Sequence, residues 1–227
     1  MRVKVFFIHT VSGLTGMFNE LCAELVPDAD LCHVSDESII QRILAAEGLT
    51  PAVCRRACEH IVAAEAAGAQ VIQLTCSSIS PCADVAQHLV AVPVLKIDEP
   101  MVRVAVQGYQ SVGVVATNPG TLKPSTQLVE AVAREMGKEV EVKSVLCEGA
   151  YSAWLSGNRE EHDRIVRAHL LDLMDGVEVV CLAQVSMSRA ADALTDEQKR
   201  VPVLSSPHLA VERLAAVVAG LSAEQGP

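Results

Sequence analysis

The stretch of this chain best suited to chemistry is Leu74-Thr75-Cys76-Ser77-Ser78, where a thiol stands among hydroxyl groups. The apolar run before it predicts a buried strand, and Pro81 after it predicts the start of a helix. A thiol at a helix N-terminus lies among unpaired backbone N–H groups, which favour the thiolate and can hold a carboxylate beside it. A cysteine is also often a buried structural residue. Taken alone, the stretch leaves both interpretations open.

A second feature is an internal repeat at an offset of about 108 residues. The matching pairs are residues 5–10 with 112–117, 71–78 with 179–186, and 92–95 with 201–204. This alignment places Gln184 opposite Cys76 and Ser186 opposite Ser78. The period is too long for a solenoid and fits a duplicated α/β unit. We therefore expect two lobes whose paired strand ends face each other across a cleft.

Length and composition agree with two lobes of a globular α/β protein. The chain has 227 residues, of which 50% are hydrophobic and only 3% aromatic. Many Ala and Val residues suit helices packed on a parallel sheet, and the few aromatic residues offer no stacking platform for nucleic acid. A formal charge of −10 without a Lys/Arg run also argues against nucleic acid or anionic membrane as a partner.

The cysteines indicate a reduced compartment and no metal site. The chain has eight cysteines but no Cys-x-x-Cys pair, and its N-terminus opens into a predicted strand without a signal peptide or a membrane span. Cys54 and Cys58 share one face of a predicted helix, but no His or second Cys pair stands at zinc-site spacing. We expect these two to be core residues, and the protein to be cytoplasmic.

The predicted elements alternate between strand and helix, which is typical of parallel α/β sheets. Strands are expected near residues 2–8, 31–34, 71–74, 92–95, 111–116, 139–147, 178–184 and 201–204. Helices are expected near residues 14–25, 36–46, 51–67, 81–89, 98–107, 125–136, 151–154, 159–174 and 208–220. We expect residues 1–97 to form the first lobe and 98–204 the second, with residues 205–227 packing back on the first.

Polar residues follow the first strand of each expected lobe, at the sheet edge where open parallel sheets bind ligands. In the first lobe these are His9, Thr10 and Ser12. In the second they are Thr117, Asn118 and Thr121, in a hydroxyl-rich loop that lacks the glycines of a phosphate-binding or dinucleotide-binding loop. A histidine here is either a structural residue or a base. The hydroxyls either cap a helix or bind a carboxylate, and we expect the second.

Four stretches of the chain together have a family signature. They are Leu74-Thr75-Cys76-Ser77-Ser78, Ile97-Asp98-Glu99-Pro100, Val112–Thr117 with Gly120, Thr121 and Ser125, and Leu182–Met187. In this order they resemble the aspartate/glutamate/hydantoin racemase superfamily over nearly the whole chain. The first is similar to the first-half cysteine motif, and the last stands where the second-half Gly-Cys-Thr-His would be.

The resemblance implies two pseudo-symmetric lobes, a site between them, no cofactor, and two thiols. These thiols would remove and return a proton on opposite faces of a carbon next to a carboxylate. Here Gln184 stands in the second cysteine's place, and an amide neither takes nor gives a proton near neutral pH. Ser186 stands where many members have His. The superfamily also contains single-cysteine decarboxylases of the arylmalonate type and cis-trans isomerases.

From the residues and the resemblance together, we expect a cofactor-independent racemase or isomerase of a small carboxylic acid. Cys76 would be the acid/base, and His9 would be a second base. The expected substrate-binding residues are Thr10, Ser12, Thr75, Ser77, Ser78, Thr117, Asn118, Thr121, Gln184 and Ser186. The alternatives are a decarboxylase, in which Cys76 only protonates a carbanion, and a non-catalytic small-acid binding protein. The resemblance also implies a homodimer.

Overall fold

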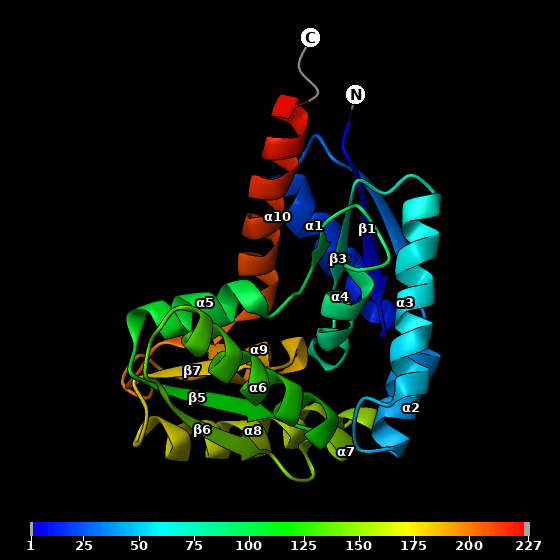
Figure 1. The fold of residues 1–227 in the computed structure, drawn as a ribbon. Helices are drawn as coiled ribbons and strands as arrows, with labels where there is room; N and C mark the ends of the chain where they lie inside the picture. The colour runs from blue at the N-terminus through cyan, green and yellow to red at the C-terminus, as the bar shows by residue number, and fades with distance from the viewer. Residues whose placement is uncertain (1, 225–227) are drawn as a thin grey trace. The chain divides into compact units, whose positions relative to one another are not determined.

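The computed structural model describes residues 2–224, which divide into two compact units. The first unit comprises the chain up to Asp98 and again from Pro207, and the second is Glu99–Ser206. Each unit contains one four-stranded parallel sheet flanked by helices (Figure 1). The α/β fold expected from the sequence is therefore confirmed.

The sheet of the first unit has the strand order β2-β1-β3-β4. Its strands are β1 (Lys4–His9), β2 (Asp30–Ser35), β3 (Val71–Leu74) and β4 (Val94–Leu95). Its helices are α1 (Thr15–Leu25), α2 (Glu37–Ala45), α3 (Pro51–Ala66), α4 (Pro81–Ala86) and α10 (Ser206–Glu224). Two short 3-10 turns, η1 (Ser12–Leu14) and η2 (Ser77–Ile79), come before α1 and α4.

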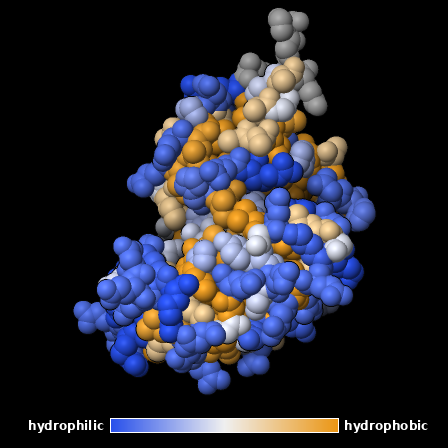
Figure 2. Space-filling view, turned by 90° about the vertical axis from the view of Figure 1, so that its left-hand side faces the viewer, coloured by the Kyte–Doolittle hydropathy of each residue, from blue (hydrophilic) through white to orange (hydrophobic). Residues whose placement is uncertain are grey.

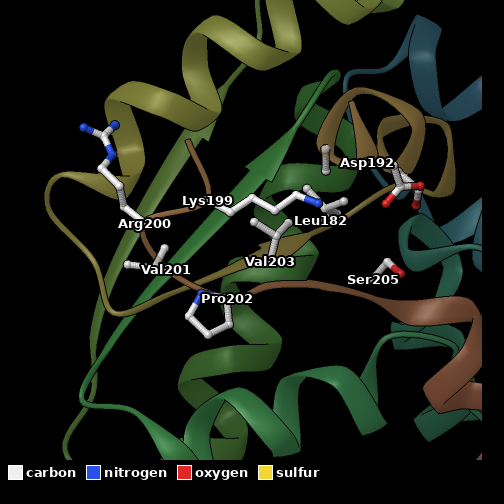
Figure 3. A pocket seen from close by; sticks show the side chains of 10 residues that line it. Leu182, Asp192, Lys199, Arg200, Val201, Pro202, Val203 and Ser205 are labelled. Atoms are coloured by element: carbon white, nitrogen blue, oxygen red, sulfur yellow. The ribbon is translucent and has the colours of Figure 1, made fainter. Parts of the chain in front are cut away.

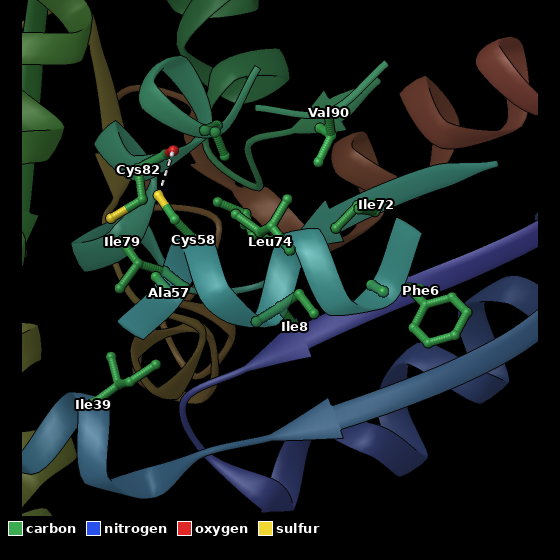
Figure 4. Close-up of a cluster of buried hydrophobic side chains, with 14 of the residues drawn as sticks. Phe6, Ile8, Ile39, Ala57, Cys58, Ile72, Leu74, Ile79, Cys82 and Val90 are labelled. Atoms are coloured by element: carbon green, nitrogen blue, oxygen red, sulfur yellow. Dashed lines mark hydrogen bonds between the residues drawn. The ribbon is translucent and has the colours of Figure 1, made fainter. Parts of the chain in front are cut away.

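The alternation of β1 divides its side chains between two faces of this sheet. Phe6 and Ile8 lie in a buried cluster with apolar residues of α2, α3 and α4 (Figure 4). Phe7 packs on the opposite face against Phe18 of α1, with ring centroids 5.2 Å apart. Burial of each such side chain contributes about 1.5–3 kcal/mol. Because His9 follows Phe7 at the strand period of two, its ring lies on the α1 face.

One carboxylate joins two helices of the first unit. Asp36 lies just before α2 and accepts a hydrogen bond from Ser38 N at 3.0 Å, as an N-cap residue does. The same side chain accepts hydrogen bonds from Arg56 and His60 of α3, each at 2.8 Å. The hydrogen bond from the Ser38 hydroxyl, together with those from His60 and Arg56, lowers the pKa of Asp36.

The sheet of the second unit has the strand order β6-β5-β7-β8. Its strands are β5 (Ser111–Ala116), β6 (Glu141–Leu146), β7 (Val179–Leu182) and β8 (Val203–Ser205). Its helices are α5 (Glu99–Gly108), α6 (Pro119–Glu135), α7 (Ala150–Leu155), α8 (Arg159–Met174) and α9 (Ser188–Asp192), with a 3-10 turn η3 (Val185–Met187). Helices α5 and α6 lie on one face of the sheet and α8 on the other (Figure 1). A Cβ atom at Gly113 would come within 2.8 Å of Leu173 Cδ2, so the glycine lets α8 approach β5 closely.

The two sheets repeat each other in strand order and in register. Ile8 of β1 pairs with Leu74 of β3 in the first unit, and Val115 of β5 pairs with Leu182 of β7 in the second. These partners differ by 107 and 108 positions, which are the offsets found in the sequence. The internal repeat is therefore structural, and residues after β3 can be compared directly with residues after β7.

The structure corrects several expected boundaries. Helix α4 ends at Ala86 and is followed by a turn, so the helix expected to reach Leu89 is shorter. Most of the loop expected at 117–125 is helix, because α6 already begins at Pro119, where a proline's fixed φ and missing N–H suit the first helical position. Helix α10 continues past Gly220. The turn η3 and helix α9 were not expected, and residues 225–227 of the expected C-terminal segment lie outside the described residues.

On the face shown in Figure 2, hydrophilic residues surround smaller apolar patches. The large apolar side chains left exposed are Val11, Val62, Val85, Leu89, Val104 and Leu155. Within residues 2–224 no helix is long and apolar enough to cross a membrane. In the same range, no group of three or more His, Cys, Asp or Glu residues could hold a metal ion.

Candidate active site

Cys76 lies where β3 meets η2, and its thiol is more accessible than most thiols of the chain. Its backbone is extended, with φ −135° and ψ 120°, and the residue is half-buried. Five other cysteines are buried: Cys22, Cys58, Cys82, Cys147 and Cys181. Burial raises the pKa of the Cys147 and Cys181 thiols to about 12. These buried cysteines behave as small apolar residues, in contrast to Cys76.

A polar turn separates Cys76 from the helix expected to begin at Pro81, and this turn has 3-10 form. Ile79 N donates to Cys76 O at 3.1 Å, which closes a 3-10 turn, and α4 begins only at Pro81. Proline prefers the first position of a helix, which agrees with the expected start at Pro81. The groups nearest to Cys76 along the chain are therefore the buried side chains of Thr75 and Ser77. Ser78, the next residue, is also buried.

A buried carboxyl group that was not among the expected site residues lies beside this turn. Asp98 is 1% exposed, and its Oδ1 accepts a hydrogen bond from Ser80 Oγ at 2.6 Å. Its Oδ2 is buried and has no hydrogen-bond partner among the described residues. Burial raises the pKa of Asp98, although hydrogen bonds from Ser80 and Ser77 oppose this. The turn that carries Cys76 thus lies against a carboxyl group whose charged form is disfavoured by burial.

His9 is buried, and both of its ring nitrogens face hydrogen-bonding partners. Nδ1 lies 2.9 Å from Thr75 Oγ1, and Nε2 lies 2.8 Å from Nδ1 of His33 on β2. Burial, with a smaller effect of His33, lowers the pKa of His9 to about 4. A neutral, enclosed ring of this kind has no free nitrogen for direct contact with a substrate. Its role as second base stays a prediction.

The other two polar residues after β1 lie in different surroundings. Thr10 is buried, at 1% exposure. Ser12 is exposed, and both its N–H and its hydroxyl donate to Glu37 Oε1, at 3.0 and 2.6 Å. The hydroxyl of Ser12 is therefore used in holding η1 to α2, and the structure does not bring it into the hydrogen bonds around Thr75.

In the second unit, the structure joins two expected site residues directly. Gln184 precedes η3 with φ −140° and ψ 138°, almost the backbone of Cys76. Thr117 donates to Gln184 Oε1 from its backbone N at 2.6 Å and from its hydroxyl at 2.9 Å. A backbone N–H needs an acceptor, so these bonds fix the carbonyl oxygen of the amide toward Thr117. The Nε2 group of Gln184 is then left as a hydrogen-bond donor.

The start of α6 carries the remaining expected donors. Thr121 Oγ1 lies 3.2 Å from Asn118 Oδ1, and both residues are 3% exposed. Asn118 Nδ2 and Ser125 Oγ are buried without a hydrogen-bond partner among the described residues. Ser186 is half-buried within η3. An unsatisfied amide N–H₂ group at the N-terminus of a long helix is suited to an anionic ligand such as a carboxylate.

Two residues of this arrangement were missed from the sequence, and each had a weak signal. His33 was read only as part of a short strand, and its contact with His9 follows from the β1–β2 register, which pairs it with Phe7. Asp98 belongs to a stretch that supported the family resemblance, but its burial depends on the fold of the turn after Cys76. His33 could therefore not be assigned to the site before the strand register was known, and Asp98 could not be assigned before the fold of the turn was known.

A cavity of about 360 Å³ in the second unit lies apart from these residues. It is lined by Leu182, Ser188, Ala191, Asp192, Lys199, Arg200, Val201, Pro202, Val203 and Ser205 (Figure 3). None of the expected site residues lines it, and its charged side chains are exposed. Arg200 is already bound to Asp175 and to the carbonyl oxygen of Leu171. The cavity contains no thiol and offers no support for proton transfer.

Comparisons with known proteins identify the family of this chain. The family model for Asp/Glu/Hydantoin racemase matches residues 7–214. None of the curated protein sequences matches the chain significantly.

Several solved structures share the fold at low sequence identity. Glutamate racemase RacE1 from Bacillus anthracis is 14% identical, with a TM-score of 0.74 over 96% of this chain and 82% of that chain. Allantoin racemase from Klebsiella pneumoniae is 19% identical, with a TM-score of 0.70 over 97% and 89%. An aspartate racemase homologue from Pyrococcus horikoshii is 17% identical, with a TM-score of 0.67 over 95% and 99%. The expected enzyme class is confirmed: the chain belongs to the Asp/Glu/hydantoin racemase family.

Proposed function

We propose that the protein is a cofactor-independent racemase or isomerase that moves a proton next to the carboxylate of a small acid, with Cys76 as its one catalytic thiol. The observation that carries this proposal is the equivalence of Cys76 and Gln184 in the two repeated sheets. Both have extended backbones directly before a 3-10 turn, but Gln184 is held by Thr117 with its Nε2 group as a donor. One turn therefore offers a titratable group and the other offers hydrogen bonds.

The chemistry follows from these two kinds of group. The Cys76 thiolate takes the proton of the substrate's α-carbon, so that an S–H bond forms while the C–H electron pair passes into an enolate. Donors at Gln184 Nε2 and Asn118 Nδ2 hold the carboxylate oxygens on which this charge develops. We propose that both turns act on one bound acid. The proton then returns to carbon as the S–H bond breaks.

A single thiol returns its proton to the face from which it came, so inversion requires a second proton donor. His9 is the candidate expected from the sequence, and its two ring nitrogens face Thr75 and His33. A positioned acid or base contributes roughly 10²- to 10⁴-fold to rate. A proton donor that does not touch the substrate is thus compatible with slow inversion at the α-carbon and faster exchange of the α-proton on the face of Cys76.

The substrate class is a small carboxylic acid or a related acidic C–H compound. The solved structures that share the fold are named for glutamate, aspartate and allantoin racemases. The buried Asn118 Nδ2 group, which has no hydrogen-bond partner among the described residues, suits a carboxylate oxygen. The homodimer and the cytoplasmic location expected from the sequence stay predictions.

Decarboxylation is a second candidate, because a single thiol is all that is needed to protonate a carbanion on one face. The observation that favours it is the absence of a thiol at position 184, which removes the two-thiol symmetry. In this reaction the C–C bond to one carboxylate breaks and that carboxylate leaves as carbon dioxide. The electron pair of the bond passes into an enolate with the remaining carboxylate, and the Cys76 thiol supplies the proton to the α-carbon. Carbon dioxide release separates this reaction from racemisation.

The test is solvent deuterium exchange into a panel of acids. The panel contains both enantiomers of aspartate and glutamate, allantoin and phenylmalonate, each followed by NMR in D₂O. Wild type should exchange at least one of them, Cys76→Ala should lose the exchange by about 10²-fold or more, and Cys32→Ala, which changes another partly buried thiol, should keep it. Exchange that persists in Cys76→Ala would exclude Cys76 as the base. Binding without exchange or carbon dioxide release would instead indicate the small-acid binding protein.

A further inference from the structure

The cavity of the second unit is lined by four polar side chains that have no hydrogen-bond or ion-pair partner among residues 2–224. They are Ser188, Asp192, Lys199 and Ser205. Ser188 begins α9, and Ser205 ends β8. In Figure 3 the Lys199 side chain points toward Leu182, on the side of the cavity where Asp192 lies. One cation, one carboxylate and two hydroxyls are therefore free to bind a ligand at this cavity.

The internal repeat shows how the first unit treats the same positions. Ser205 corresponds to Lys96, since the strands β8 and β4 pair with β7 and β3 in the same register. Asp192 corresponds to Asp84 at the offset of 108, and both lie in the short helix after a 3-10 turn. In the first unit Lys96 Nζ lies 2.7 Å from Asp84 Oδ1, and the Lys96 side chain is only 14% exposed. The carboxylate of the first unit is thus paired by a cation that the second unit lacks.

The hydroxyl at the start of α9 has also lost the partner of its counterpart. Ser188 corresponds to Ser80, whose hydroxyl donates to Asp98 Oδ1 at 2.6 Å. Pro207 stands at the position of Asp98 in the second half of the sequence, and a proline side chain accepts no hydrogen bond. The two halves therefore differ at both partner positions, and each difference leaves a polar group free beside the cavity.

The charges and the walls of the cavity together indicate the class of ligand. Leu182, Ala191 and Val203 give it an aliphatic wall, whereas Lys199 and Asp192 carry opposite charges at its exposed part. A ligand with only a carboxylate would leave Asp192 unpaired, and a ligand with only an ammonium group would leave Lys199 unpaired. An aliphatic α-amino acid carries both charges on one carbon and an apolar side chain, so it fits all three features.

We propose that this cavity is a binding site for a small aliphatic α-amino acid in its zwitterionic form. Asp192 binds the ammonium group, and Lys199 binds the carboxylate with the hydroxyls of Ser188 and Ser205. The volume of about 360 Å³ is within the range of small-molecule sites. The proposal does not depend on the proposed function, because the cavity shares no residue with the candidate active site.

The first test is an NMR titration of the ¹⁵N-labelled full chain with valine, isovalerate and isobutylamine. The last two compounds are valine without its ammonium group and valine without its carboxylate. Valine should shift the amide resonances of the cavity residues saturably, with a Kd on the order of 1 mM, because ion pairs at an exposed rim contribute little. Isovalerate and isobutylamine should each bind about 2- to 5-fold more weakly, since each loses one ion pair.

Two results of this titration would overturn the proposal. One is the lack of a saturable shift at the cavity with alanine, valine and leucine of either hand, including the case in which shifts occur only around Thr117 and Asn118 of the candidate active site. The other is equal binding of valine and isovalerate, which would show that the cavity binds an anion without reading the ammonium group.

The second test restores the ion pair of the first unit. Ser205→Lys places a cation at the position of Lys96, where it can pair with Asp192, so valine should no longer bind saturably. Gln127→Lys is the matched control, because it adds the same charge at an exposed position of α6 outside the cavity, and it should bind valine as wild type does. Valine binding at the wild-type Kd in Ser205→Lys would overturn the proposal.

Two further variants keep the proposal testable if Ser205→Lys does not fold. Asp192→Asn and Lys199→Gln change exposed side chains, and each should raise the Kd for valine by about 2- to 5-fold. Glu130→Gln removes an exposed charge on α6 and should leave the Kd unchanged. An unchanged Kd in both Asp192→Asn and Lys199→Gln would overturn the assignment of these two residues and with it the zwitterion site.

Discussion

The carboxyl ends of β3 and β7 have nearly the same backbone and very different side chains. Cys76 and Gln184 both lie in extended conformation before a 3-10 turn, at positions related by the internal repeat. The first turn adjoins the buried Asp98 and His9, whereas the second holds its amide with two bonds from Thr117. Duplication has thus preserved the position and changed the chemistry: the first end can titrate, and the second can only donate and accept hydrogen bonds.

The strongest way to break this comparison is to make the first turn like the second. Cys76→Gln places an amide at both strand ends, so no group at either position can take a proton, and we expect proton exchange to fall by roughly 10²- to 10⁴-fold. Gln184→Ala should keep part of the exchange. NMR in D₂O measures both, and equal losses in the two variants would contradict the assignment of unlike roles.

The opposite change makes the second turn like the first. Gln184→Cys should create a two-thiol site and therefore gain or accelerate inversion of an α-proton acid, because each thiol serves one face. Deuterium incorporation followed separately for the two enantiomers detects this. Wild type should exchange mainly one face, and a wild type that exchanges both faces equally, with no change in Gln184→Cys, would show that position 184 does not face the substrate.

A smaller effect is expected from the hydroxyl that holds the amide. Thr117→Val removes the 2.9 Å bond to Gln184 Oε1 but keeps the backbone bond, so substrate binding should weaken by about 0.5–1.5 kcal/mol. Thr126→Val is the matched control, because Thr126 lies on the following helix α6 and its hydroxyl bonds to the Leu122 carbonyl oxygen within that helix. KM or calorimetry measures the difference, and an equal effect of the two variants would separate Thr117 from the site.

Much of this comparison could be predicted from the sequence, and the reason is periodicity. The repeated strands rich in Val and Ile predict the two sheets. The offset of the internal repeat predicts that Cys76 and Gln184 are equivalent, and the strand register confirms this. Helix starts were predictable where a cap or proline determines them locally, as at Asp36 and Pro51.

The features of the site that could not be predicted depend on contacts between residues far apart in sequence. His33 reaches His9 only because β2 pairs with β1 in one particular register, and a slip of one residue would turn it to the other face. Asp98 lies 18 residues from its partner Ser80. The helix start at Pro81 was predictable from the proline, but the 3-10 form of the turn between Cys76 and Pro81 was not, because hydroxyl residues before a proline are typical of helix caps as well as of 3-10 turns.

The histidine pair should make the first strand end sensitive to pH, whereas Ala116, the equivalent of His9 in the second unit, contributes nothing. The pKa of His9 is about 4 in the fold and 6.5 ordinarily, so the unfolded chain binds the proton first as the pH falls. Stability should therefore decrease between about pH 6.5 and 4, by at most about 1.4 kcal/mol per pH unit for this group. Urea unfolding at several pH values measures the slope.

The control for this prediction is His9→Asn, which should flatten the slope in that window, while His88→Ala should keep it. Asp36, whose pKa is lowered, acts in a separate range because its contribution is lost only as the pH falls below about 3.8. An unchanged slope in His9→Asn would show that the buried ring does not titrate as its surroundings require.

The smallest expected effect concerns Asp98, which the repeat places opposite Pro207 and which therefore has no counterpart carboxyl in the second half. Burial raises the pKa of Asp98, so below about pH 3.8 the carboxyl does not lower the free energy of unfolding. As the pH rises, the carboxyl lowers this free energy, because the unfolded chain ionises more readily than the folded one. Asp98→Asn should consequently stabilise the protein at pH 7 and have little effect near pH 3. A gain of about 1 kcal/mol would raise the Tm by about 2–4 °C in a chain of this size, and calorimetry at the two pH values measures it.

If the variant is more stable yet exchanges protons more slowly, the carboxyl is kept for its effect on the Cys76 turn. If it is less stable at pH 7, the bond from Ser80 outweighs the burial of the charge.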